Sequence, residues 1–478
     1  MNIPFTSYSW ATRVVGPAIM FIAYCILAKD NLIIILTIPL FLSIIYFSSI
    51  EKDKFINEFD IINIIFFLFF VITPLQVIDE GSFTTRNYYS FIPITPYRLI
   101  ISQAIVLVFY NVVMYFLKFR KIQYNTYFVK SSDKAAILLF SILCIAFVLH
   151  IISYGGIGNL LASRYFRETG DVNVTMMGWK ALIIVTSVML TAISFGADRS
   201  SLFQKLICIA GLFLLAISVN PFNIARNVFF GAWLPIFIII VRGRITPFHM
   251  YASFALVITV FMPIFNFTSR EGYTLAEATS VYSDNLARYI SAPFSDTYGM
   301  LVACVWWFED VGFYWGQKTL GLLLFLVPRS FWTSKATLTG LDIGDYIHSA
   351  GYTGTDNLSF FVGGDFYADF GIFGVLLGAI LTYHVLRLSI YKNKISVNGW
   401  PIKNLLFMGA LPILIRGPLG ANVGLFFFEI LFVSILIRVL PLMASDTLFV
   451  KRSLRKPPIR TARQGRSRLA PALQRQRR

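Results

Sequence analysis

The chain has 478 residues, of which 57% are hydrophobic and only 14% are charged, whereas about a quarter of an ordinary soluble domain is charged. Together with an aromatic content of 16%, this composition excludes a soluble enzyme, a disordered protein and a disulfide-rich scaffold. It predicts an all-α polytopic membrane protein.

The formal net charge of +17 is concentrated at one end of the chain. Residues 451–478 contain 11 basic and no acidic residues, so only +6 of the net charge belongs to the rest. We expect this Arg-rich tail to be a disordered extension that could contact anionic lipid headgroups, and we expect no nucleic-acid partner. The four cysteines are scattered without metal-ligand spacing, so no disulfide framework, metal site or cofactor is expected.

A helix that spans a bilayer needs about 20 mostly apolar residues. Apolar runs, separated at charges, prolines and glycine clusters, predict about twelve transmembrane helices, at 14–28, 32–50, 61–78, 99–117, 135–153, 179–197, 203–219, 227–241, 246–266, 366–386, 401–415 and 422–441. The first run lacks a convincing cleavage site, which favours an anchor over a signal peptide.

Lys and Arg are denser in alternate connections, which orients the chain by the positive-inside rule. The basic set consists of 52–54, 118–134, 199–205, 242–244, 387–403 and the tail. The other set consists of 29–31, 79–98, 154–178, 220–226, 267–365 and Arg416. We therefore expect both termini in the cytoplasm and the two largest loops on the outside.

The predicted organisation alternates groups of spans with external loops. The segments are helices 1–5 in 1–153, a medium loop in 154–178, helices 6–9 in 179–266, a long loop in 267–365, helices 10–12 in 366–441 and a basic cytoplasmic tail in 442–478. The long loop is too long for a mere connector. Its semi-apolar pieces at 299–308 and 319–327 could be re-entrant or interfacial helices.

Most external basic residues are arginines, whose guanidinium grips phosphate oxygens through two parallel hydrogen bonds. A lipid-linked diphosphate carries its charge at this depth, just outside the hydrocarbon. Interfacial snorkelling and ion pairing in loops are the alternative. The candidate phosphate ligands are Arg164, Arg167, Arg226, Arg270, Arg288, Arg329 and Arg416.

Four residues are candidates for the catalytic acids and bases. His348 lies among aspartates in the long loop, where a tuned imidazole could accept a hydroxyl proton. Asp365 and Asp369 lie one helical turn apart at the start of the tenth run, although Asp365 could simply be an N-cap. Glu429 lies well inside the last run and is expected to pair with Arg416 or to face a cavity.

Two stretches, VPRSFWTSK (327–335) and FFVGGDFYADFGIFGVLLG (360–378), resemble the O-antigen polymerase (Wzy) family, also called oligosaccharide repeat unit polymerases. Asp365 stands where the family usually has Glu, and Asp369 stands where Asn is common. The turns NPFNIARN (220–227) and TSREG (268–272) are similar to the family's Arg-bearing external turns.

The resemblance implies a GT-C-like, O-antigen ligase-like architecture in the bacterial inner membrane. It implies a glycosyltransferase that joins undecaprenyl-diphosphate-linked repeat units at the periplasmic face, with arginines stabilising the departing diphosphate instead of a metal. Membrane lipids surround such a protein, and its partners could include a chain-length regulator and a flippase. Four external tryptophans could stack on sugar faces, and interfacial anchoring explains them equally well; they are Trp306, Trp307, Trp315 and Trp332.

Two other functions stay open at this point. The sister O-antigen ligase would use the same donor with lipid A-core as acceptor. A lipid-linked oligosaccharide flippase or other transporter should show charges in several spans and an internal repeat, and the sequence shows neither clearly.

Overall fold

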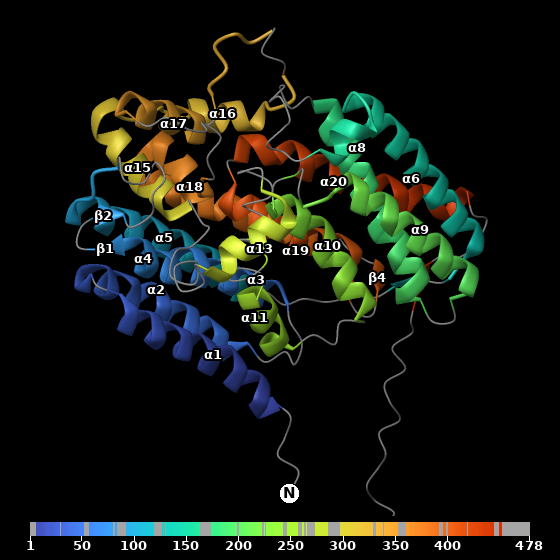
Figure 1. Ribbon diagram of the computed structural model, residues 1–478, viewed down its shortest axis with the longest axis horizontal. Helices are drawn as coiled ribbons and strands as arrows, with labels where there is room; N and C mark the ends of the chain where they lie inside the picture. Colours follow the sequence, from blue (N-terminus) through green and yellow to red (C-terminus); the bar gives the residue numbers. More distant parts are fainter. Residues whose placement is uncertain are drawn as a thin grey trace, which may run out of the picture.

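The computed structural model is helical, with helices packed side by side through its centre and a group of helices over one end (Figure 1). It describes residues 6–28, 30–51, 57–79, 82–83, 92–118, 127–129, 131–162, 174–197, 200–221, 224, 226–241, 246–256, 261, 264, 273–284, 297–327, 331–337, 339–351, 360–391, 395–397, 400–417, 419–443 and 449–451.

Seven helical stretches among the described residues are long and apolar enough to cross a membrane: Asn31–Ile50, Glu58–Leu75, Pro96–Lys118, Asp133–Ser153, Met176–Gly196, Val362–Arg387 and Val423–Pro441. Three shorter apolar helices cover Thr12–Leu27, Leu202–Ser218 and Val228–Ile240. The prediction of a multi-span helical protein is therefore confirmed. The count of twelve stays a prediction, because the runs at 246–266 and 401–415 fall in neither group.

The elements that form these spans are α1 (Thr6–Leu27), α2 (Asn31–Ile50), α3 (Glu58–Phe66) continued by the π-helix η1 (Phe67–Ile72) and α4 (Thr73–Val77), α5 (Pro96–Lys118), α6 (Asp133–Ser153), α8 (Val174–Thr191) continued by the π-helix η4 (Ala192–Gly196), α9 (Leu202–Ser218), α10 (Arg226–Ile240), α18 (Val362–Tyr391) and α20 (Leu419–Met443). Helices α11 (Pro247–Leu256) and α19 (Ile402–Arg416) occupy the other two predicted runs.

The long loop is mostly helical in its described parts. It contains α13 (Leu275–Asp284), α15 (Thr297–Val311), α16 (Gln317–Leu323) and α17 (Thr339–Ser349). We call α15, α16 and α17 with their connecting turns the cap, and Figure 1 shows them together at the top of the view. The segment 299–308 lies within α15, and its side chains from Gly299 to Val305 are buried.

Connections that the sequence places on one side of the membrane meet one another. Strand β3 (Tyr127–Val129) pairs with β4 (Ile395–Val397) and with β6 (Phe449–Lys451), and β4 pairs with β5 (Trp400–Pro401). The three connections in this small sheet all belong to the basic set. The all-α fold class is confirmed, and the strands are only short pairings between connections, including the hairpin β1 (Ile78–Asp79) and β2 (Ser82–Phe83).

The opposite set of connections is also joined within itself. Arg98, before the fourth predicted span, donates to both carboxylate oxygens of Glu309 in α15. Asn220 donates through Nδ2 to the carbonyl of Leu160 in α7 (Ile157–Leu161), at 3.2 Å. The described connections therefore form two groups, as expected if the intervening helices alternate in direction.

A proline in the third span is accommodated by a neighbouring side chain. Pro74 has no N–H, so it cannot donate to the carbonyl of Phe70 four residues earlier. Gln103 of α5 donates through Nε2 to that carbonyl at 3.3 Å. The helix widens here into η1, and Thr73 Oγ1 donates to the carbonyl of Leu68. Backbone groups at membrane depth need such partners because lipid offers none.

Helix α18 is two helices joined at a break. Phe370 and Gly371 depart from helical geometry, and Gly371 has φ +61° and ψ −143°. The first part, from Val362 to Asp369, is largely buried, whereas the second part carries a stripe of exposed apolar residues. The tenth predicted run therefore begins in a separate short helix, which the cap covers.

Candidate functional site

The structure describes only part of the predicted phosphate-binding group. The guanidiniums of Arg164, Arg167, Arg270, Arg288 and Arg329 lie outside the described residues. Arg226 is the first residue of α10, and its side chain is also outside the described set. Arg416 is the predicted phosphate ligand whose side chain can be placed.

Arg416 is a buried cation at the junction between the spans and the cap. It ends α19, and only 7% of its surface is exposed. Its Nε donates to Thr297 Oγ1, the first residue of α15, at 3.3 Å. Its guanidinium carbon lies 5.3 Å from the centroid of the Phe69 ring. Phe69 belongs to η1, so the widened turn in the third span presents an aromatic face to the cation.

The position of Arg416 follows from its helix. Helix α19 is buried along nearly its whole length, which brings its last residue into the interior of the protein. The partial negative charge of a helix C-terminus favours a cation at this place. Glu429 was expected to pair with Arg416 or to face a cavity, and the first alternative is wrong, because the described ion pairs do not include one between these two residues. Glu429 is buried in α20.

Asp369 fixes the start of α16. Its carboxylate accepts hydrogen bonds from the backbone N–H of Lys318 at 3.1 Å and of Thr319 at 2.6 Å, and from the Thr319 hydroxyl. In return, the N–H groups of Tyr314 and Trp315 donate to the carbonyls of residues 368 and 369, directly before the break in α18. The carboxylate is fully buried and holds the cap against the broken helix.

A lysine completes this junction. Lys318 Nζ forms an ion pair with Asp342 of α17, and Thr337 donates through its hydroxyl to the same carboxylate. The ammonium also lies 4.5 Å from the centroid of the Tyr314 ring. Burial, and secondly the negative charge of Asp342, raises the pKa of Tyr314 above its ordinary value. The cluster connects α16, α17 and the turn before α16.

His348 and Asp365 lie on different elements of the same end of the molecule. His348 is a half-buried residue near the end of α17, and its carbonyl accepts from the N–H of Gly351 at 2.9 Å. Asp365 lies half-buried in the first part of α18, whereas Asp369 one turn later is fully buried. Of the two aspartates, Asp365 is therefore the more accessible to a substrate.

The end of α15 carries an aromatic and charged surface. Trp306 has the Arg98 guanidinium 5.9 Å from one ring centroid and packs edge-on against Tyr346. Tyr346 donates to the carboxylate of Asp310. Burial, followed by the hydrogen bond to Asp310, raises the pKa of Tyr346 to about 12. The phenol therefore stays a hydrogen-bond donor throughout the physiological range.

The four external tryptophans have unequal access to a sugar. Trp307 is buried and stacks on Tyr314, so the expectation that it binds a sugar is wrong. Trp306 is half-buried between Arg98 and Tyr346. Trp332 is half-buried and donates to Ser334, and Trp315 is largely exposed.

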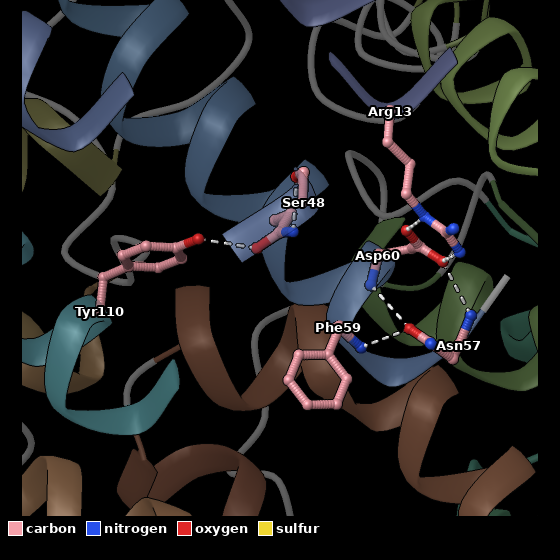
Figure 2. Close-up of polar contacts among 7 residues, drawn as sticks. Arg13, Ser48, Asn57, Phe59, Asp60 and Tyr110 are labelled. Atoms are coloured by element: carbon pink, nitrogen blue, oxygen red, sulfur yellow. Dashed lines mark hydrogen bonds and ion pairs between the residues drawn. The ribbon is translucent and has the colours of Figure 1, made fainter. Parts of the chain in front are cut away.

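Sequence reasoning missed a polar cluster inside the helices at the other end of the third span. Arg13 of α1 donates through Nε and Nη2 to the two carboxylate oxygens of Asp60, at 2.6 and 2.8 Å. Both side chains are at most 1% exposed. Asn57 and Asp60 also form a reciprocal N-terminal cap of α3. Figure 2 shows Asp60 held between Arg13 and Asn57.

The same cluster extends along α3. Tyr110 donates to Asn63 Oδ1 at 2.8 Å, and Asn63 donates to the hydroxyl of Ser48 at 2.9 Å (Figure 2). Asn404 at the start of α19 donates to Glu58 at 3.3 Å. The apolar runs in the sequence begin at residue 14 and at residue 61, so these charged residues have the pattern of boundaries between a connection and a span. The capping pattern Asn57-x-x-Asp60 would have signalled the earlier helix start.

No group of three or more His, Cys, Asp and Glu side chains that could hold a metal occurs among the residues that the structure describes. Comparisons of the chain with protein-family models, with curated proteins and with solved structures found no match.

Proposed function

We propose that this protein is a glycosyltransferase that polymerises undecaprenyl-diphosphate-linked oligosaccharide repeat units into O-antigen or a related surface polysaccharide. It would cross the bacterial inner membrane with twelve helices in a GT-C-like arrangement. Both termini would be cytoplasmic, and the cap would face the periplasm. An acceptor sugar hydroxyl would attack the anomeric carbon of the donor, and the polyprenyl diphosphate would leave.

The observation that carries this proposal is the burial of Arg416 where the spans meet the cap. A diphosphate on a membrane lipid lies at the end of the hydrocarbon region, which is where the proposed arrangement puts the end of α19. A guanidinium held in a site that excludes water stabilises developing negative charge more strongly than one in water. The diphosphate is a good leaving group, so such stabilisation and a base for the acceptor are the main requirements.

His348 and Asp365 are the two residues proposed for the base, because each is partly accessible and lies in or beside the cap. Asp369 is better suited to a positioning role, since its carboxylate is occupied by the N-terminus of α16. Glu429 is proposed to support the packing of α20 below this site.

The proposal is tested by replacing Arg416 with Ala and with Lys in a bacterium that lacks its own copy of the gene. We expect Arg416→Ala to lower the polymerisation rate by about 100-fold or more, which is the typical effect of removing a transition-state donor. Long glycan ladders on a gel should disappear, leaving core plus one repeat unit. Arg416→Lys should restore little, because an ammonium cannot replace a bidentate guanidinium.

Arg438→Ala is the matched control, because Arg438 lies in the same helical hairpin near the opposite end of α20. Its ladder should be unchanged at an equal amount of protein. A normal ladder in Arg416→Ala would contradict the proposed role of Arg416. Deletion of the gene separates the alternatives: bare core indicates a ligase or a flippase, whereas core plus one repeat indicates a polymerase.

A further inference from the structure

One edge of the cap is apolar although it lies outside the candidate spans. Trp315, Leu323 and Phe331 are 76%, 70% and 86% exposed. An exposed apolar patch of this kind marks a contact surface and is unusual for a segment that faces only water. We call the exposed apolar side chains of this edge the apolar rim; they are Phe313, Trp315, Leu320, Leu323, Leu324, Leu326 and Phe331.

The exposed apolar side chains of the rim belong to α16 and its flanking turns, and the neighbouring helix α17 has a different pattern. On the neighbouring α17, the large aliphatic side chains Ile343 and Ile347 are fully buried, and Asp345 is exposed. Helix α17 thus has the pattern of an ordinary water-facing helix, with apolar residues inside and charge outside. Helix α16 and its flanking turns have large apolar side chains on the outside.

The rim continues directly into the faces of two spans. Phe325, in the turn after α16, packs against Phe427 of α20 with ring centroids 5.4 Å apart. At the other end, Phe313 packs over Gly371 at the break in α18. Beyond these contacts, both spans present exposed apolar residues such as Phe373 on α18 and Leu431 on α20. Figure 1 shows α16 above α18 and α20.

Backbone groups at the start of α16 and in the turn after it have hydrogen-bond partners within the protein. Asp369 accepts from two N–H groups of its first turn. Lys335 donates through Nζ to the carbonyls of Leu324, Phe325 and Val327, at 3.0 to 3.1 Å. Unsatisfied helix termini are the feature that normally excludes a short helix from lipid. Here side chains of the protein bind the first turn of α16 and the turn that follows its last residue, Leu323.

We propose that the apolar rim inserts into the lipid monolayer on the cap side of the membrane, with phospholipid acyl chains as its occupant. Helix α16 then lies in the membrane–water interface, between the ends of α18 and α20. Trp315 lies at headgroup level, where amphipathic rings are enriched. The rim holds the cap against the membrane surface. This inference does not depend on the proposed enzymatic activity or on which side the cap faces.

The test uses the full-length protein in liposomes of phosphatidylethanolamine and phosphatidylglycerol. Leu323→Cys, Phe331→Cys and the control Asp345→Cys are each labelled with a polarity-sensitive fluorophore, and the wild-type chain labelled in parallel supplies the background from its own cysteines. Lipids with a nitroxide on the upper acyl chain should quench the labels at 323 and 331 at least twofold more than the label at 345. Aqueous iodide should show the opposite order.

Two outcomes would overturn the proposal. Equal iodide quenching at all three positions would mean that the rim faces water. Protection of positions 323 and 331 from both quenchers would mean that protein, such as a second copy of the chain, covers the rim. The substituted side chains are highly exposed, so folding should be preserved, and the thermal unfolding midpoint of each labelled variant checks this.

Discussion

Two buried arginines illustrate how differently one residue type can be used in this protein. Arg13 forms a two-hydrogen-bond ion pair with Asp60 and ties α1 to α3. Arg416 contacts a hydroxyl and an aromatic ring at the opposite end of the helices. A buried ion pair between two helices suits a structural role, whereas a buried guanidinium at the junction of the spans and the cap lies where the proposed anion would bind.

The Arg13–Asp60 pair gives a prediction about stability. Arg13→Met would leave the Asp60 carboxylate buried without its guanidinium, which should lower the free energy of unfolding by about 3–5 kcal/mol. Arg13→Met combined with Asp60→Asn removes both charges and keeps an acceptor for the α3 cap, so it should recover most of that loss. Equilibrium unfolding in mixed micelles measures both. A single variant as stable as the wild type would show that the pair contributes little.

At the scale of elements, the break in α18 depends on backbone conformation. Gly371 has φ +61°, which L-residues rarely adopt, and a Cβ there would meet Phe313 Cε1 at 2.8 Å. The break allows Asp369 and its preceding carbonyls to bind the turn before α16. A continuous helix would bond those carbonyls internally and could not hold the cap.

We predict that Gly371→Ala lowers the free energy of unfolding by at least about 1–3 kcal/mol, the cost of a strained backbone conformation. Hydrogen exchange should rise in α16 and in the first part of α18. Gly178→Ala is the matched control, because Gly178 lies inside α8 and a Cβ added there would meet nothing within 4 Å. That substitution should be neutral or stabilising by up to about 1 kcal/mol. Equal effects of the two substitutions would argue against a structural role for the break.

At the scale of the whole molecule, the described connections form two groups at opposite ends of the helices. The sheet of β3, β4, β5 and β6 joins connections of the basic set. The Arg98–Glu309 pair joins connections of the other set. The positive-inside rule predicts that the first group is cytoplasmic.

This topology predicts opposite accessibility for two exposed positions. In intact cells, a membrane-impermeant maleimide should label Asp345→Cys on α17. It should label Lys134→Cys, beside β3, only after the membrane is permeabilised. The reverse pattern would place the cap in the cytoplasm and would remove the basis of the proposed periplasmic chemistry. Labelling of both positions in intact cells would contradict an arrangement with two opposite faces.

The sequence by itself determined the membrane class, the positions of most helices and the grouping of their connections. These follow from apolar runs and local charge, which need no knowledge of distant contacts. Two predicted runs begin too late. They start at residues 14 and 61, whereas the helices start at Thr6 and Glu58, because charged residues near a helix end resemble a boundary. Such residues belong to a span only when a partner on another helix, here Arg13 for Asp60, compensates their burial.

Only the tertiary structure decided the environment of each candidate site residue. The sequence pattern does not distinguish Asp365 from Asp369 as candidate site residues. In the structure, Asp365 is partly accessible, whereas Asp369, beside the break at Gly371, binds the N-terminus of α16. Arg416 lies beside Thr297, 119 residues earlier in the chain, and not beside Glu429 as its sequence proximity suggested. Packing of distant helices sets which polar groups are buried and what they contact, and this information is not local in the sequence.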